Sequence, residues 1–190
     1  HGQEAAVPFV EVTGVCLQQA VEGVFAEGPL QNCLYAKSES IVPHFKLHQR
    51  NTALFRRTEE KTEQRLHDEQ NTDKKIHITA MGPLGHIYLP VPLRPDDMGK
   101  YAQRLVHEAD IPLVFYLHND AIICVNGSGS AELEAKAKEI FGSGHPFIQE
   151  VTRDMERICR HPDAGEFVIS GWRPEQPTLT FAFENGAHGG

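Results

Sequence analysis

The chain has 190 residues, of which 40% are hydrophobic and 23% are charged, close to the averages of globular proteins. This composition excludes a disordered chain, a collagen-like fibre and a coiled coil, and no apolar run approaches the roughly 18 residues that a membrane-spanning helix needs. The formal net charge of -8 argues against broad electrostatic binding of nucleic acids.

The first predicted element is a helix over residues 11–27, where apolar residues recur at helical spacing until Gly28 and Pro29 end it. Residues 46–75 are then polar and charged, and they predict a variable charged excursion that is exposed to solvent. A binding arm is the alternative interpretation of this stretch.

Short apolar or alternating runs after this stretch predict strands. They cover residues 76–80, 86–89, 112–117, 121–125, 167–170 and 178–183. Helical spacing predicts helices over 96–109 and 131–141, and a third helix that begins at His145-Pro146 and ends before 162–165. Because helices and strands alternate and hairpins are frequent, the sequence predicts an α/β fold with a mixed β-sheet flanked by helices.

The four cysteines include no C-x-x-C pair, which argues against a zinc ribbon or a thioredoxin-type motif. They are Cys16, Cys33, Cys124 and Cys159. Cys16, Cys124 and Cys159 lie within apolar patterns, so we expect buried free thiols there rather than a disulfide.

Eleven histidines are unusual for a chain of this length and raise the question of a metal site. His1 and His188 stand out because each is followed by glycine, which lets the backbone bend close to a metal. Taken singly, each is better explained as a solvent-exposed histidine. Helix ends and turns are the expected places of five others: His67, His107, His118, His145 and His161.

Two further features have both a structural and a functional interpretation. Residues 127–130, with the sequence Gly-Ser-Gly-Ser, could cradle a phosphate, but they lack the lysine of a P-loop, so a plain connecting loop is favoured. Trp172 either lines a substrate cleft or packs at the end of a strand, and the packing role is favoured.

Four segments of the chain carry a family resemblance. They are His1-Gly2-Gln3, Met81-Gly82-Pro83-Leu84-Gly85-His86-Ile87-Tyr88-Leu89, Gly165-Glu166-Phe167-Val168-Ile169 and Gly186-Ala187-His188-Gly189-Gly190. In this order and separation, with a helix and the predicted hairpin over residues 112–125 between the second and third segments, they resemble the later half of the alkaline-phosphatase superfamily, in its type I phosphodiesterase and nucleotide pyrophosphatase branch. The resemblance covers nearly the whole chain apart from residues 46–75.

The resemblance implies a partial alkaline-phosphatase-like αβα sandwich. Residues 1–190 would be a single C-terminal part of a larger metal-dependent hydrolase domain, cut at both ends. Two divalent metal ions, usually zinc, would share one site, with His1 as a ligand of the metal beside the nucleophile and His188 as a ligand of the other. The Thr or Ser nucleophile and most carboxylate ligands, including an Asp directly before His1, would lie upstream of this sequence.

The function that the resemblance implies is hydrolysis of a phosphate-ester small molecule, as a phosphodiesterase or phosphatase. A metal suits this reaction because it lowers the pKa of a bound hydroxyl and stabilises charge on the phosphoryl group. The 190-residue chain would be inactive by itself, since it lacks the nucleophile. Phosphomutases and sulfatases share the metal turns, so the reaction subtype stays open.

The shared site makes a geometric prediction. Metals in two-metal sites lie roughly 3.5–4 Å apart and each ligand bond adds about 2 Å, so the imidazole nitrogens of His1 and His188 should lie within about 10 Å of each other. The alternative function, from a different class, is a non-catalytic α/β binding or interaction module in which the two His-Gly turns are coincidental or the metal site has decayed.

Overall fold

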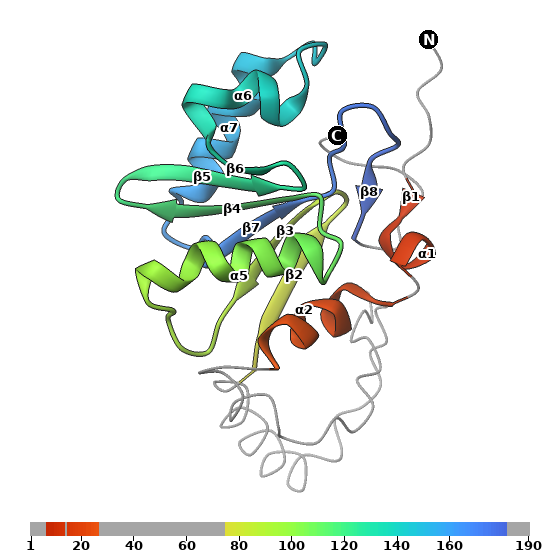
Figure 1. Cartoon of the computed structure of the whole chain (residues 1–190), viewed down its shortest axis with the longest axis vertical. Helices are drawn as coiled ribbons and strands as arrows, with labels where there is room; N and C mark the ends of the chain where they lie inside the picture. Colours follow the sequence, from red (N-terminus) through yellow and green to blue (C-terminus); the bar gives the residue numbers. More distant parts are fainter. Residues whose placement is uncertain (1–6, 14, 27–74, 182–190) are drawn as a thin grey trace, which may run out of the picture.

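A computed structural model describes residues 7–13, 15–26 and 75–181 of the chain (Figure 1). The described strands are β1 (Val7–Pro8), β2 (His77–Met81), β3 (Leu84–Tyr88), β4 (Leu113–His118), β5 (Ala121–Asn126), β6 (Gly129–Glu132), β7 (Phe167–Ser170) and β8 (Leu179–Thr180). The described helices are α1 (Phe9–Thr13), α2 (Leu17–Phe25), α5 (Pro95–His107), α6 (Leu133–Phe141) and α7 (Ile148–Cys159).

Six strands form one sheet in the order β2-β3-β7-β4-β5-β6, and every neighbouring pair in it is antiparallel. The hairpin between β4 and β5 turns at Asn119 and Asp120, which both adopt the positive φ angles that a tight hairpin turn requires. Strand β7 comes late in the chain but inserts between β3 and β4, so it joins the two hairpins into one sheet.

Helices cover both faces of this sheet (Figure 1). Side chains alternate along each strand, so Val114 and Tyr116 of β4 pack with α2 and α5, whereas Leu113 and Phe115 pack with α6 and α7. The predicted α/β fold with a sheet flanked by helices is therefore confirmed. The parallel component of the described sheets is confined to the pair β1–β8.

The signals at the ends of α5 show why the sequence places a helix there. Pro95 stands at its first position, and Asp96 and Asp97 occupy the first turn, where the positive end of the helix dipole favours carboxylates. Arg94 precedes the helix and its Nε donates to the Asp97 carboxylate at 2.8 Å. The prediction of a helix over 96–109 is confirmed to within two residues at either end.

The helix predicted over residues 11–27 is divided into α1 and α2. The Thr13 hydroxyl donates to the Phe9 carbonyl at 3.0 Å and accepts from the Val15 amide at 3.4 Å, so it competes with the continuing helix for backbone partners. Cys16 then precedes α2 with an extended backbone. It is exposed, so the prediction that Cys16 is a buried thiol is wrong.

Two other boundaries differ from the predictions. The helix predicted over 131–141 begins only at Leu133, because the four residues before it pair with β5 as the strand β6. The predicted loop 127–130 is correspondingly shorter, since Gly129 already belongs to that strand. In the described ranges, no helix is both long enough and apolar enough to cross a membrane.

Candidate functional site

The two predicted metal ligands, His1 and His188, lie outside the described residues, as do residues 46–74 of the predicted charged excursion. Lys75, the last residue of that predicted stretch, is described and exposed. What the structure shows is how the chain is held at the nearest described positions, Val7 and Phe181.

Val7 is the first residue of β1, and Phe181 directly follows the neighbouring strand β8. Val7 and Pro8 of β1 pair in parallel with Leu179 and Thr180 of β8, and the Val7 amide donates to the Thr178 carbonyl at 2.9 Å. The rings of Phe9 and Phe181 lie beside this pair with their centroids 5.6 Å apart. The first and last described segments of the chain are therefore adjacent.

Hydrogen bonds also connect β8 and its neighbouring residues to the turn between β2 and β3. The Phe181 amide donates to the Gly82 carbonyl at 2.9 Å, and the Gly171 amide donates to the Pro83 carbonyl at 2.7 Å. The Leu179 amide in turn donates to the Gly171 carbonyl at 2.9 Å. A Cβ at Gly171 would fall on the Leu179 carbonyl oxygen, so only glycine allows this approach.

The two internal motif segments are neighbours in the main sheet. Gly85 of β3 pairs with Ile169 of β7, and Ile87 pairs with Phe167. Gly165 precedes β7 and lies directly against β3, where a Cβ would stand 2.5 Å from the Ile87 carbonyl oxygen. Two of the four segments that carry the family resemblance are described, and they are in contact. The β2–β3 turn, which belongs to the first of them, also accepts a hydrogen bond from the Phe181 amide directly after β8.

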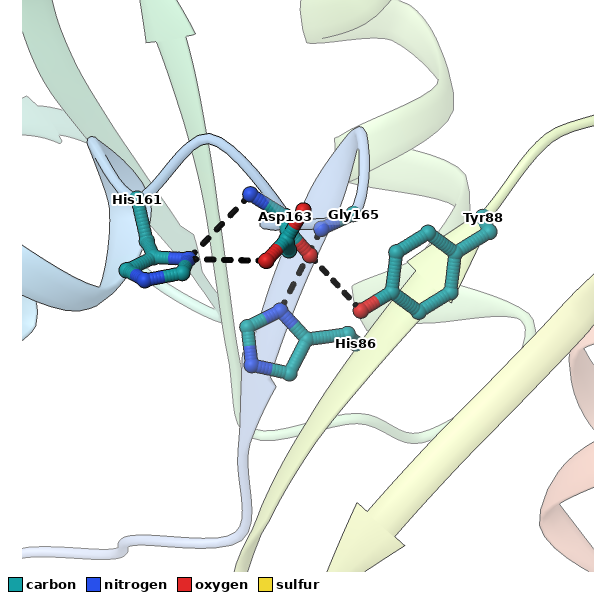
Figure 2. Close-up of polar contacts among 5 residues, drawn as sticks. All are labelled: His86, Tyr88, His161, Asp163 and Gly165. Atoms are coloured by element: carbon teal, nitrogen blue, oxygen red, sulfur yellow. Dashed lines mark hydrogen bonds and ion pairs between the residues drawn. The ribbon is translucent and has the colours of Figure 1, made fainter.

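A cluster of polar side chains joins β3 to the connection between α7 and β7 (Figure 2). His86 Nδ1 accepts from the Gly165 amide at 3.3 Å, and the Tyr88 hydroxyl donates to the Asp163 carbonyl at 2.9 Å. His161 Nδ1 accepts from the Asp163 amide at 3.1 Å. Both imidazoles accept at Nδ1, so in their neutral forms both carry the proton at Nε2.

The environment of His86 disfavours its charged form. It is half-buried, and this burial lowers its pKa below the ordinary value, with a smaller contribution in the same direction from His161. The Glu166 carboxylate, which stands at the same end of β7, accepts from the Leu89 amide at 2.8 Å. The polar side-chain atoms of this cluster therefore form hydrogen bonds with backbone groups.

The cysteine thiols of the other face are inert packing groups. Burial raises the pKa of the Cys159 thiol to about 12 and raises that of Cys124 as well. Both pack into the cluster of apolar side chains beneath α6 and α7, and both are free. The predictions of free thiols at these two positions are confirmed, with Cys124 fully buried and Cys159 half-buried.

Trp172 packs in the structure. Its Nε1 donates to the Phe141 carbonyl at 3.0 Å, and the His145 ring stands edge-on to it with centroids 4.9 Å apart. His145 also accepts at Nδ1 from the Phe147 amide at 3.1 Å. The positions predicted at helix ends and turns are confirmed for His107, His145 and His161, whereas His118 is the last residue of β4, directly before the hairpin turn.

Within the described ranges, no group of three or more His, Cys, Asp or Glu side chains is arranged to hold a metal ion. Sequence reasoning missed the hydrogen bond of His86, because the Gly165 amide that it accepts from lies 79 residues further along the chain. Comparison of the chain with protein-family models, with curated proteins and with solved structures found no match.

Proposed function

We propose that the chain is part of a metal-dependent hydrolase of phosphoric esters, in which His1 and His188 each bind one of two divalent metal ions. Imidazole and carboxylate ligands suit zinc in such a site. The observation that carries the proposal is the parallel pairing of β1 with β8, which joins the two ends of the described chain.

The reach of the chain is compatible with a shared site. His1 is six residues before Val7, and His188 is seven residues after Phe181. An extended chain covers at most about 3.3–3.6 Å per residue, so each tether reaches roughly 20–25 Å. Because the two tethers start from paired strands, the imidazoles have the length of chain needed to come within about 10 Å of each other.

The contacts among the motif segments support the same proposal. The segment Gly165–Ile169 pairs with β3, and the Gly82 carbonyl at the start of β3's hairpin binds the Phe181 amide just before the last segment. Segments with a common task in one site are expected to converge in this way. The superfamily likeness itself rests on the four sequence motifs.

The described residues do not by themselves fit a complete metal centre, since they offer no group of three or more ligands. The proposal therefore assigns the ligands to the two His-Gly turns and to residues upstream of His1. It makes a prediction about that upstream sequence: an Asp directly precedes His1, and a Thr or Ser nucleophile with its own Asp ligands lies further upstream.

The test uses the full-length protein with its upstream sequence, assayed for hydrolysis of bis(4-nitrophenyl) phosphate and for bound zinc by mass spectrometry. We expect His1→Ala and His188→Ala each to lower turnover by orders of magnitude and to reduce bound zinc, while the melting temperature without metal stays nearly unchanged. His118→Ala, in the β4–β5 hairpin, is the matched control and should keep both activity and metal.

Full activity in either variant contradicts the proposal, as does an upstream sequence without the Asp and the nucleophile. The non-catalytic α/β interaction module then becomes the better description. The 190-residue chain alone should not hydrolyse 4-nitrophenyl phosphate esters, because the proposed nucleophile lies outside it. Metal-dependent turnover by this chain would show that the site is assigned wrongly.

A further inference from the structure

The connection between α7 and β7 is held on β3 by His86, whose Nδ1 accepts from the Gly165 amide, and by Tyr88, whose hydroxyl donates to the Asp163 carbonyl. Figure 2 shows His86 and Tyr88 of β3 beneath the connection, with His161 at its beginning. His86 fixes the Gly165 amide and His161 fixes the Asp163 amide, at 3.3 and 3.1 Å. Two backbone N–H groups of one short loop therefore depend on imidazoles that are uncharged.

We propose that His86 is a pH-sensitive latch, which holds the α7–β7 connection on β3 while its imidazole is neutral and releases it when the imidazole gains a proton. The proposal is independent of the hydrolase function. It rests on the direction of the hydrogen bond from the Gly165 amide, because an imidazole that accepts at Nδ1 becomes a donor there once it is protonated.

Protonation of His86 would remove the acceptor of the Gly165 amide and place a positive charge in a half-buried position. His161 adds to this effect, since it already disfavours the charged form of His86. Loss of the acceptor and the unfavourable charge would both weaken the hold of β3 on the connection.

The residues that face His86 from the neighbouring strands carry no negative charge that would stabilise its protonated form. The residues opposite it in the sheet are Thr79 of β2 and Val168 of β7, and neither ionises in this range. The remaining titratable or charged groups near the latch are Tyr88, whose ring lies 6.0 Å from that of His86, exposed His77 opposite Tyr88, Glu166 on the Leu89 amide, and Arg160 on the Asp120 carbonyl.

Two other hydrogen bonds between these segments do not involve an imidazole. The Tyr88 hydroxyl donates to the Asp163 carbonyl, and the Glu166 carboxylate accepts from the Leu89 amide. Release should therefore affect the Gly165 amide and leave the sheet intact.

The test is amide hydrogen exchange of the 190-residue chain, measured by NMR between about pH 7.5 and about pH 5 and expressed as protection factors. As the pH falls through the range in which His86 gains a proton, the protection of the Gly165 amide should fall by up to about tenfold per pH unit. The β4–β5 amides, such as that of Ile122, should keep their protection and report that the fold persists.

The variant His86→Asn keeps an acceptor near the Nδ1 position but does not titrate, so the protection of its Gly165 amide should not change with pH. His118→Asn is the matched control and should behave like the wild type. Direct observation of the imidazole nitrogens by NMR in the unaltered chain supplies a readout that needs no variant, and His86 should carry the Nε2 proton at neutral pH.

Three results would overturn the latch: constant protection of the Gly165 amide in the wild type down to about pH 5, an equal fall in the His86→Asn variant, or a simultaneous fall in β4 and β5. An Nδ1 proton on neutral His86 would also overturn it, because that nitrogen would then be unable to accept.

Discussion

At the scale of single residues, three glycines let backbone segments approach more closely than any side chain allows. Gly165 lies against Ile87, Gly171 lies against Leu179, and a Cβ at Gly85 would stand 2.9 Å from the Thr79 carbonyl oxygen. Gly23 is the opposite case, since it sits in α2 with no atom within 4 Å of the place a Cβ would occupy.

Gly171→Ala should lower the free energy of unfolding by about 2 kcal/mol or more, because β8 must move away from the loop. Gly23→Ala, its matched control, should raise it by about 1 kcal/mol through helix propensity. Urea unfolding followed by circular dichroism measures both. Equal stability of the two variants would mean that the contact at Gly171 is wrongly placed.

The half-buried His86 predicts how stability depends on pH. Burial and His161 lower its pKa in the folded chain below the ordinary 6.5, so the unfolded chain binds more protons in the interval between the two values. Stability contributed by this group is complete above 6.5 and is lost as the pH falls through the folded pKa. Urea midpoints should therefore fall on acidification, and less steeply in His86→Asn. An unchanged slope in that variant would assign the effect to other groups.

Thiol reactivity should separate the cysteines by their surroundings. Cys16 is exposed, whereas burial raises the thiol pKa of both Cys124 and Cys159. A maleimide added to the native chain should label Cys16 within minutes and label Cys124 and Cys159 only after denaturation, as read by peptide mass spectrometry. Rapid native labelling of Cys124 would contradict the packing of β5 beneath α6.

At the scale of elements, short segments gain stability from the partners they meet. Strands β1 and β8 have two residues each, and α1 has five, so none of them is stable on its own. They are held by their parallel pairing, by the contact between Phe9 and Phe181, and by the bond from Phe181 to the β2–β3 turn.

Phe9→Ala should therefore cost about 3–5 kcal/mol, because the Phe9 side chain is 1% exposed and fills the space beside β8. Val12→Ala on the same helix should change stability by no more than about 0.5 kcal/mol, since Val12 is 51% exposed. Calorimetry of the two variants makes the comparison. A Phe9 variant as stable as the Val12 variant would remove the support for a docked N-terminal segment.

At the scale of the whole molecule, β7 decides the architecture. It pairs with β3 on one side and β4 on the other, and it brings Phe167 and Ile169 to one apolar cluster and Val168 to the other. All four of its residues are buried. The two hairpins of the sheet and both layers of helices therefore meet at this strand.

Hydrogen exchange should reflect that central position. The amides of β7 and β4 should be the most protected, and those of β6, an edge strand with three exposed residues of four, should exchange first. Mass-spectrometric exchange on proteolytic fragments resolves these segments. Faster exchange in β7 than in β6 would mean that the two hairpins open separately and that β7 does not join them.

The sequence by itself determined the elements with strong local patterns. The period of the apolar residues and the end signals at Pro95 place α5, and the alternation around Asn119-Asp120 places the β4–β5 hairpin, because these patterns act between residues close in the chain. The same patterns established the α/β class. The candidate ligands His1 and His188 also come from sequence alone, through motif order, and remain a prediction.

Only the tertiary structure decided what depends on contacts between distant segments. The insertion of β7 between β3 and β4 and the pairing of β1 with β8 involve partners that no local pattern specifies. The role of His86 was decided in the same way, because its acceptor nitrogen is fixed by the Gly165 amide of a loop far along the chain. Local periodicity identifies which residues seek burial or a partner, whereas the free energy of packing the whole chain selects which partner each one meets.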